Sequence, residues 1–393
     1  MSYIPSRLMR TPITASLLHG WVDLEETESG IIPHRLPSWA RRQWPDQQLA
    51  MSESQPSGVC IRLRTAATIV EVEALPTKRV YAGMPPRPEG VYALVIDGVP
   101  SQQASIPTGD VIRIDLSGGA SSGSGVEIIP GAPGSVRFAG LAASDKQIEI
   151  WLPHNEATRL VALYSDAPVF PAKRSDRLVW LHHGSSISQG SNAASPTSIW
   201  PSVAATIADV DLLNLSFGGS ALLDPFVART IRDISADRIS LKLGINIVNM
   251  DLMRLRGFGP AVHGFLDTIR EGHADTPLLI VSPILCPMHE HVPGPSAPDF
   301  ADGEMKFRAT GDPAEVAAGR LTLSVIRDAL QAVVAQRRRA DLNIHYLDGR
   351  TLYGEDDHLQ RPLPDRLHPD DDTHRLIGQR FADAVFKAAG PLR

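Results

Sequence analysis

The sequence is poor in cysteine, with Cys60 and Cys286 as the only two among 393 residues. Two cysteines so far apart provide no disulfide framework, which is typical of proteins from a reducing compartment. The chain also lacks any run of about 18 apolar residues, which argues against a membrane-spanning helix. Residues 1–21 contain no continuous apolar segment of the kind found in signal peptides. We therefore expect a cytoplasmic protein that does not interact with membranes.

The chain also has only a small excess of charge of one sign. The chain carries 38 Lys and Arg against 44 Asp and Glu, a net charge of −6, and it has no basic cluster that would indicate a nucleic-acid partner. The run Arg337–Arg339 is explained by the end of a helix, where cations interact favourably with the helix dipole. With 43% hydrophobic and 21% charged residues, the composition is that of a globular protein. The length favours two domains. The sequence leaves the oligomeric state open.

The first part of the chain, from about Ala15 to Ser165, alternates apolar and polar residues over short segments and contains no convincing long helix. Asp97-Gly98 is a strong signal for a two-residue hairpin turn. Several short strands separated by turns predict an all-β sandwich. The expected strands are Val59–Thr65, Thr68–Ala74, Val91–Ile96, Val111–Leu116, Ser135–Phe138, Gln147–Leu152 and Arg159–Tyr164.

The pattern changes after the proline-containing segment Asp166–Asp176, where we place a domain boundary. Beyond it, strands alternate with helices, which predicts a parallel sheet covered on both faces. We therefore expect an all-β sandwich over residues 1–172 and an α/β domain over residues 173–393. The expected strands are Leu178–Leu181, Val210–Leu215, Arg238–Leu243, Pro277–Ser282 and Leu342–Leu347. The expected helices are Ile199–Asp209, Ala221–Ile234, Phe258–Glu271, one from Asp312 through Val333, and Asp371–Ala389.

A candidate nucleophile follows the first of these strands. The apolar run Leu178–Leu181 is followed by Gly184 and the serines Ser185, Ser186 and Ser188. A serine between a strand and a helix lies at the carboxyl edge of the sheet, where open α/β sheets bind ligands. The N–H groups that begin the helix are also available there to an oxyanion. Alone, this pattern fits an ordinary polar loop equally well.

A candidate base and its partner stand in the segment before the last helix. Asp365 and His368 are three residues apart in a proline-flanked loop. A serine hydroxyl needs a base at neutral pH, and the base needs a carboxylate to fix its tautomer and orientation. An Asp-x-x-His loop supplies both groups. Taken by itself, it is also explained by a histidine packed near a helix N-terminus and an aspartate that caps a turn.

Two further segments end predicted strands with residues that could face a ligand. Asn214–Ser220 contains the pair Gly218-Gly219, where a bare backbone N–H is accessible, and Lys242–Asn246 ends in an asparagine whose amide can donate a hydrogen bond. Either segment alone is more simply a tight turn.

Taken together and in this order, the four segments resemble the conserved blocks of the SGNH (GDSL-type) hydrolases. Gly184–Ser188 resembles the G-D-S-[LI]-[ST] block, Gly219 the glycine of the second block, and Asn246 the asparagine of the G-x-N block. Asp365 and His368 match the D-x-x-H block. The resemblance covers residues 177 to 392 and implies a flavodoxin-like α/β/α sandwich.

The resemblance also implies a role for each matched residue. Ser186 is the expected nucleophile, His368 the base, and Asp365 the carboxylate that orients it. The backbone N–H groups of Ser186 and Gly219 and the side chain of Asn246 form the expected oxyanion hole. The chain departs from the family pattern at two positions outside the triad: Ser185 stands where the family usually has aspartate, and Ile247 where aspartate often follows the asparagine.

The N-terminal half has a resemblance of its own. Gly30–Trp39 and Pro56–Val59 look like the β-sandwich of a bacterial GDSL subgroup, which includes an acyltransferase that tailors a tetracycline-type polyketide. This similarity implies acylation of a hydroxyl group on a polyketide-like natural product as one possible reaction.

These observations predict acyl transfer through an acyl-enzyme on Ser186. The expected partners are a small-molecule acyl donor, with an acyl thioester such as an acyl-CoA as an option, and a hydroxyl acceptor or water. No cofactor is expected. No metal is expected either, because His182-His183 and His289–His291 lack the spacing of a metal site. The alternatives are a plain carboxylesterase or carbohydrate esterase, and a non-catalytic carbohydrate-binding protein. The segment Cys286–Asp312 is expected to be an irregular loop that covers the substrate.

Overall fold

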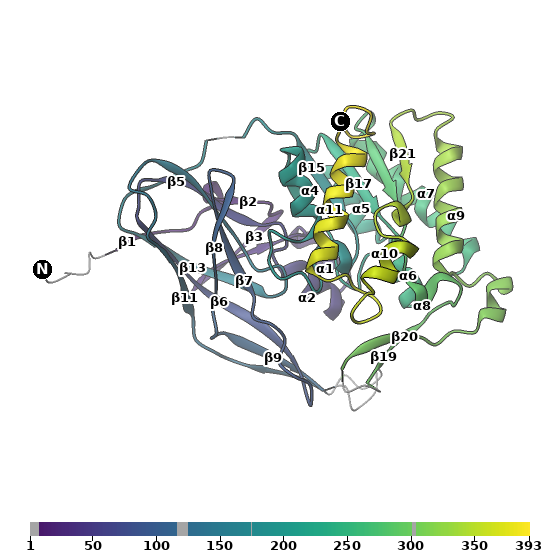
Figure 1. Cartoon of the computed structure of the whole chain (residues 1–393), viewed down its shortest axis with the longest axis horizontal. Helices are drawn as coiled ribbons and strands as arrows, with labels where there is room; N and C mark the ends of the chain where they lie inside the picture. Colours follow the sequence, from purple (N-terminus) through teal and green to yellow (C-terminus); the bar gives the residue numbers. More distant parts are fainter. Residues whose placement is uncertain (1–7, 116–124, 174, 301–303) are drawn as a thin grey trace, which may run out of the picture. The chain divides into compact units, whose positions relative to one another are not determined.

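The computed structural model describes residues 8–115, 125–173, 175–300 and 304–393 (Figure 1). Two compact units make up the chain. The first comprises Met1–Arg35, Ser54–Ser175 and Ser195–Thr197, and the second comprises Leu36–Glu53, Asp176–Ala194 and Ser198–Arg393. A single boundary after residue 172 therefore misassigns two segments. Leu36–Glu53 belongs to the second unit, although strands of the first unit flank it in the sequence, and Ser195–Thr197 belongs to the first.

Two sheets form the first unit. The larger has the order β10-β9-β6-β13-β4-β3, with β1 paired to β13 and β11 to β6, and the smaller has the order β14-β5-β12-β7-β8, with β2 paired to β5. All pairs are antiparallel except β6 with β9. The strands are β1 Met9–Thr11, β2 Leu18–His19, β3 Asp23–Thr27, β4 Gly30–His34, β5 Cys60–Thr65, β6 Ile69–Tyr81, β7 Val91–Ile96, β8 Val99–Ser105, β9 Asp110–Ile114, β10 Val126–Ile129, β11 Gly134–Ala139, β12 Lys146–Trp151, β13 Ala157–Ser165 and β14 Val169–Pro171.

One hydrophobic core joins the two sheets. Alternate residues of β6, such as Val70 and Val72, are buried in the same cluster as Ile61 of β5 and Ile148 of β12. This alternation explains why the period-two pattern of the sequence located β5, β6, β7, β9, β11, β12 and β13. The other seven strands of the unit were not predicted. The expected strand Val111–Leu116 corresponds to β9, and its last residue lies outside the described residues.

The predicted hairpin is present. Asp97 and Gly98 connect β7 and β8 with φ angles of 48° and 81°, so both are left-handed, as a type I′ turn requires.

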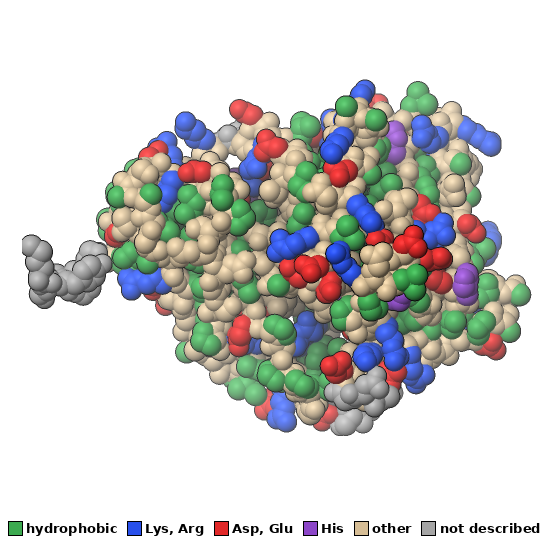
Figure 2. All heavy atoms as spheres, in the orientation of Figure 1, with side chains coloured by type: hydrophobic (Ala, Val, Ile, Leu, Met, Phe, Trp, Pro, Cys, Tyr) green, Lys and Arg blue, Asp and Glu red, His purple; other side chains and the backbone are tan. Residues whose placement is uncertain are grey.

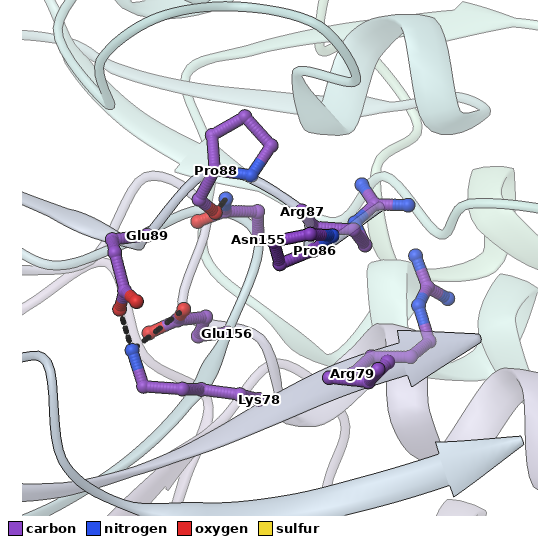
Figure 3. Close-up of a pocket in the computed structure, with 9 residues that line it drawn as sticks. Lys78, Arg79, Pro86, Arg87, Pro88, Glu89, Asn155 and Glu156 are labelled. Atoms are coloured by element: carbon purple, nitrogen blue, oxygen red, sulfur yellow. Dashed lines mark hydrogen bonds and ion pairs between the residues drawn. The ribbon is translucent and has the colours of Figure 1, made fainter. Parts of the chain in front are cut away.

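A cavity of about 60 Å³ lies on the first unit, between β6 and the segments around Pro88 and Asn155 (Figure 3). Lys78 forms ion pairs with Glu89 and Glu156 there, and Glu156 also accepts a hydrogen bond of 2.9 Å from the backbone N–H of Gly90. Burial raises the pKa of Glu156, an effect that Lys78 opposes. Opposite charges thus balance each other on this wall of the cavity.

The second unit is built on a five-stranded parallel sheet with the order β16-β15-β17-β18-β21. Numbered along the chain, this is the order 2-1-3-4-5 of flavodoxin-like doubly wound sheets. The strands are β15 Val179–His183, β16 Asp211–Asn214, β17 Arg238–Lys242, β18 Leu278–Val281 and β21 Ile344–Leu347, and all four residues of β18 are buried. A mixed α/β fold with several sheets agrees with the prediction.

Helices complete the second unit. They are α1 Ser38–Gln43, α2 Gln47–Ser54, α3 Ser186–Gln189, α4 Trp200–Ala208, α5 Pro225–Asp233, α6 Ile245–Asn249, α7 Leu255–Gly272, α8 Pro287–Glu290, α9 Leu323–Arg337, α10 Glu355–Gln360 and α11 Asp371–Val385. Helix α4 packs on α11, while α7 packs on both α5 and α9. Trp180 of β15 stacks on Phe381 of α11 with ring centroids 5.2 Å apart, so aromatic packing joins the sheet to the α11 layer. In the part of the chain that the structure describes, no helix has the length and apolarity needed to cross a membrane.

Three expectations differ from the structure. The helix expected from Asp312 through Val333 is divided, because Gly319 adopts a left-handed φ of 89° after a 3₁₀-helix, Pro313–Ala318, and Thr322 then caps α9. Helices α1, α2, α6 and α10 stand where no helix was expected. The segment Cys286–Asp312 is more regular than predicted, since it contains α8 and a hairpin of β19 (Ser296–Asp299) and β20 (Lys306–Ala309).

Charges on the face seen in Figure 2 are mixed, with basic and acidic side chains interspersed among the described residues. This distribution follows from the small net charge of the chain.

Two glycines test the backbone conformations described above. An added Cβ would meet no atom within 4 Å at either Gly98 or Gly264, but only Gly98 has a positive φ, whereas Gly264 lies inside α7. We expect Gly98→Ala to lower the free energy of unfolding by about 1–2 kcal/mol through left-handed strain. Gly264→Ala should raise it by about 0.5–1 kcal/mol through helix propensity. Urea unfolding followed by circular dichroism measures both. A stabilising Gly98→Ala would contradict the type I′ turn.

Candidate active site

Ser186 is the first residue of α3 and follows the strand β15 after a short turn. Ser185 is still extended, and the chain turns into the helix directly after it. Gly184 permits this close packing, because a Cβ at that position would lie 2.6 Å from the Oγ atom of Ser188. The turn thus places Ser186 at the carboxyl edge of the sheet, as the sequence predicts.

His368 approaches Ser186 from the loop before α11. The Ser186 Oγ and His368 Nε2 atoms are 2.8 Å apart, and the His368 Nδ1 atom is 2.7 Å from Oδ2 of Asp365. Because a carboxylate only accepts hydrogen bonds, Nδ1 carries the proton that it donates to Asp365. In the neutral ring, Nε2 is then the acceptor for the hydroxyl proton of Ser186. The structure thus brings together all three residues predicted to act as nucleophile, base and orienting carboxylate.

The Asp365 carboxylate is held by its own loop. Its Oδ1 atom accepts hydrogen bonds from the backbone N–H groups of Leu367, at 2.9 Å, and His368, at 2.7 Å. Arg366 accommodates this tight turn with a left-handed φ of 66°. Burial raises the pKa of Asp365, but the hydrogen bonds and charge of His368 and the two backbone N–H groups outweigh burial and lower the pKa to about 2. Asp365 is therefore ionised at neutral pH.

Asn192 and the β19–β20 hairpin add contacts to this loop that sequence reasoning missed. The Nδ2 group of Asn192 donates to Asp365 Oδ2 at 3.3 Å. The backbone N–H of Phe307 donates to the carbonyl oxygen of Asp365 at 3.0 Å, and the Phe307 ring meets the His368 ring edge-on, with centroids 5.7 Å apart. Arg366 forms an ion pair of 2.9 Å with Asp299. Nothing in the local sequence of these residues signals the contacts, which join segments far apart in the chain.

Gly219 lies in a turn beside Ser186. The turn, Phe217–Ser220, follows β16 and is closed by a 3.0 Å hydrogen bond from the N–H of Ser220 to the carbonyl of Phe217. Gly218 is so close to Ser186 that an added Cβ would lie 3.4 Å from the Ser186 Cβ atom. Gly219 has a φ of 74°, the left-handed value that favours glycine at the third position of a type II turn.

Asn246 lies near the start of α6, after β17. Its side-chain Oδ1 atom accepts a 3.1 Å hydrogen bond from the backbone N–H of Ala221, which directly follows the glycine turn. Because the carbonyl oxygen is bonded there, the Nδ2 group remains to donate to another acceptor. The backbone entering α6 depends on Gly244, with a φ of 123°, where a Cβ would lie 2.6 Å from Ile326. Asn246 and the Gly219 turn are therefore joined.

Sheet order explains why these residues meet. Strand β15 lies between β16 and β17. Ser186 follows the middle strand, the glycine turn follows one neighbour, and Asn246 follows the other. All three strands are parallel, so their carboxyl ends share one edge, where the chain direction around the sheet reverses.

Three buried histidines outside this site, His182, His183 and His289, have internal hydrogen-bond partners. The Nδ1 atom of His182 is 2.7 Å from Ser240 Oγ, that of His183 is 2.7 Å from the carbonyl of Leu215, and that of His289 is 3.0 Å from the carbonyl of Val292. Burial lowers the pKa values of His182 and His289. Within the described ranges, no group of three or more His, Cys, Asp or Glu side chains is arranged to hold a metal ion.

The fold and these contacts resemble those of SGNH/GDSL-type proteins, and comparison with solved structures confirms the resemblance. The salicylyl-acyltransferase SsfX3 from a tetracycline biosynthetic pathway is similar to this chain with a TM-score of 0.77 and 26% sequence identity, over 95% of either chain. A GDSL-like lipase from Bacteroides ovatus has a TM-score of 0.68 and 16% identity, over 95% of this chain and 96% of its own.

A family two carbohydrate esterase from Cellvibrio japonicus has a TM-score of 0.57 and 11% identity, over 96% of both chains. At such identities the lipase and the esterase share the fold alone. No protein-family model matches the sequence, and the search of curated proteins finds no similar sequence.

The lowered pKa of Asp365 predicts a pH-dependent contribution to stability. Its folded-state pKa of about 2 lies below the ordinary value of 3.8, so the carboxylate stabilises the fold above pH 4 and this contribution is lost as the pH falls toward 2. The contribution is about 2 kcal/mol. We expect wild type to exceed Asp365→Asn in free energy of unfolding by about this amount at pH 5, and the difference to shrink by pH 2. Denaturant titrations at both pH values measure it, and a constant difference would contradict the assignment.

Proposed function

We propose that the protein is a serine-dependent acyl-transfer enzyme that works through an acyl-Ser186 intermediate. The observation that carries this proposal is the continuous series of hydrogen bonds from Ser186 Oγ to His368 Nε2, at 2.8 Å, and from His368 Nδ1 to Asp365, at 2.7 Å. Esterases and an acyltransferase among the structural neighbours support the same reaction class.

In the first half-reaction, Ser186 Oγ attacks the carbonyl carbon of an acyl donor and His368 accepts the hydroxyl proton. Asp365, held ionised by its hydrogen bonds, stabilises the resulting imidazolium. The negative charge on the tetrahedral oxygen is stabilised by the N–H groups of Ser186 and Gly219 and by the Asn246 side chain. His368 then returns the proton to the leaving group, which departs and leaves the acyl group on Ser186.

In the second half-reaction, His368 deprotonates water or an acceptor hydroxyl, whose oxygen attacks the carbonyl carbon of the acyl-Ser186 ester. The bond between the acyl carbon and Ser186 Oγ then breaks, and His368 returns the proton to Oγ. Water gives hydrolysis, and a hydroxyl acceptor gives a new ester. We propose transfer to a hydroxyl acceptor, because the neighbour of 26% identity is a salicylyl-acyltransferase. An acyl thioester such as an acyl-CoA is the proposed donor, and a polyketide-like natural product the proposed acceptor class. No resident cofactor is needed for these steps.

The substitution Ser186→Ala tests the nucleophile. Because the three residues act as a unit, we expect kcat for hydrolysis of an activated ester to fall by at least about 10³-fold. Mass spectrometry should find an acyl or fluorophosphonate adduct on Ser186 in the wild type and none in the variant. Ser185→Ala is the matched control, since Ser185 precedes the helix and makes no predicted contribution to the chemistry. More than about a tenth of wild-type activity in Ser186→Ala would end the assignment.

The substitution Asn246→Ala tests the oxyanion donor. Removal of one such donor lowers kcat by about 10²–10³-fold in serine hydrolases, and we expect a loss of that size. Steady-state kinetics with the same ester separate the two constants. A change in KM alone would instead make Asn246 a binding or turn residue.

The partition between hydrolysis and transfer decides the second half-reaction. An aromatic acyl thioester is supplied with and without a polycyclic phenol or alcohol as acceptor, and the free acid and the new ester are quantified by mass spectrometry. The proposal expects the ester to accumulate at the expense of the acid. Acid alone, across a panel of hydroxyl acceptors, would identify a plain carboxylesterase.

A further inference from the structure

The segment that the sequence analysis did not assign to the second unit makes direct contacts beside Ser186. Helices α1 and α2 lie in Leu36–Glu53, and they belong to that unit. The ring of Trp39 packs under the guanidinium of Arg229 on α5, 4.3 Å from ring centroid to Cζ, a favourable cation–π contact. Asp46 begins α2 by accepting a 2.7 Å hydrogen bond from the N–H of Leu49. The first contact attaches α1 to α5, and the second caps the start of α2.

Helix α2 directs two polar side chains to the glycine turn. The Nε2 group of Gln48 donates a 2.7 Å hydrogen bond to the carbonyl oxygen of Gly218. One helical turn later, Ser52 donates through Oγ to Oε1 of Gln189, at 2.8 Å. The same Gln189 oxygen accepts a 2.7 Å hydrogen bond from the N–H of Gly218. Both backbone groups of Gly218 are therefore held, one by Gln48 and the other by Gln189.

The bond from Gln48 has a consequence for the next residue. The carbonyl of Gly218 and the N–H of Gly219 belong to one planar trans peptide, in which they point in opposite directions. Type I and type II turns differ chiefly by a flip of this central peptide, and Gly219, with its φ of 74°, has the type II form. A donor on the carbonyl therefore selects the direction in which the Gly219 N–H points.

We propose that Gln48 is a positioning residue for the reaction: its hydrogen bond to Gly218 sets the orientation of the peptide whose N–H stabilises the oxyanion. This inference rests on the proposed function, in which Gly219 is one of the oxyanion donors. Ser52 supports the arrangement through Gln189. The hydrogen bond of Gln48 goes to the Gly218 carbonyl and not to Ser186, His368 or Asp365.

The substitution Gln48→Met removes the donor but keeps the length of an exposed side chain. A misplaced donor costs up to as much as a missing one, so we expect kcat for an activated short-chain ester to fall about 10- to 100-fold, with KM changed less than about twofold. Gln47→Met is the matched control on the same helix, because Gln47 is also exposed and makes no side-chain hydrogen bond among the described residues. Equal kcat values in the two full-length variants would overturn the proposal.

The substitution Gln48→Glu gives a second test, whose expected result differs from the effect of partial unfolding. An ionised glutamate cannot donate to the Gly218 carbonyl, whereas a protonated one can. We expect the kcat ratio of Gln48→Glu to the control Gln47→Glu to be well below one at pH 8. The ratio should rise as the pH falls to 5, toward the ordinary glutamate pKa of about 4.3. Both variants keep the same catalytic residues, so the ratio isolates the effect of the charge at position 48. A pH-independent ratio would overturn the positioning role.

The two proposals fail in different ways. An active Ser186→Ala would remove the proposed function, and the role of Gln48 with it. An inactive Ser186→Ala, together with Gln48→Met that equals Gln47→Met, would leave the function standing and remove only the role of Gln48.

Discussion

The hydrogen bonds that converge on the Asp365 carboxylate are the constraint on which the site depends. One carboxylate oxygen is tied to two backbone N–H groups of its own loop, so the other oxygen has a fixed direction toward His368. The hydrogen bond from Asp365 orients the His368 ring, and the oriented ring presents its Nε2 atom to Ser186. The buried Asp365 carboxylate stays ionised because its oxygens accept these hydrogen bonds. The same hydrogen bonds lower its pKa.

The strand order of the parallel sheet brings the other site residues together, and it constrains few residues of the sequence. A strand placed in the middle, with its neighbours coming later in the chain on both sides, brings three loops to one edge. Each loop has only one position at which the backbone requires glycine. Gly184 and Gly244 give close approach, Gly219 gives a left-handed turn, and the remaining loop residues are ordinary. This economy explains how the architecture persists at 26% identity and below.

The sequence predicted those features that local patterns encode. Alternation located half of the strands of the first unit, and apolar runs located the parallel strands. The four motif segments named Ser186, Asp365 and His368, which the structure joins by hydrogen bonds, and also Gly219 and Asn246. Helix α2 escaped detection because only a few of its residues are buried, so it has little amphipathic pattern. The helix expected from Asp312 was overextended, since Gly319 was not recognised as a left-handed stop. The contacts of Gln48, Asn192 and Phe307 could not be found, because each joins segments that only tertiary structure brings together.

The place of Leu36–Glu53 in the second unit has a consequence for biosynthesis. The hydrogen bond between Ser52 and Gln189 spans 137 residues, and the segment Ser54–Ser175 of the first unit lies between them. During translation this segment leaves the ribosome long before the sheet that it packs on exists. Leu36, Ala40 and Leu49, which are buried in the folded protein, lack their packing partners until the second unit has been synthesised. In this protein the first unit can still fold first, because all but three of its residues precede Asp176. The second unit is completed only by chain closure over a long loop, a slow and non-local step.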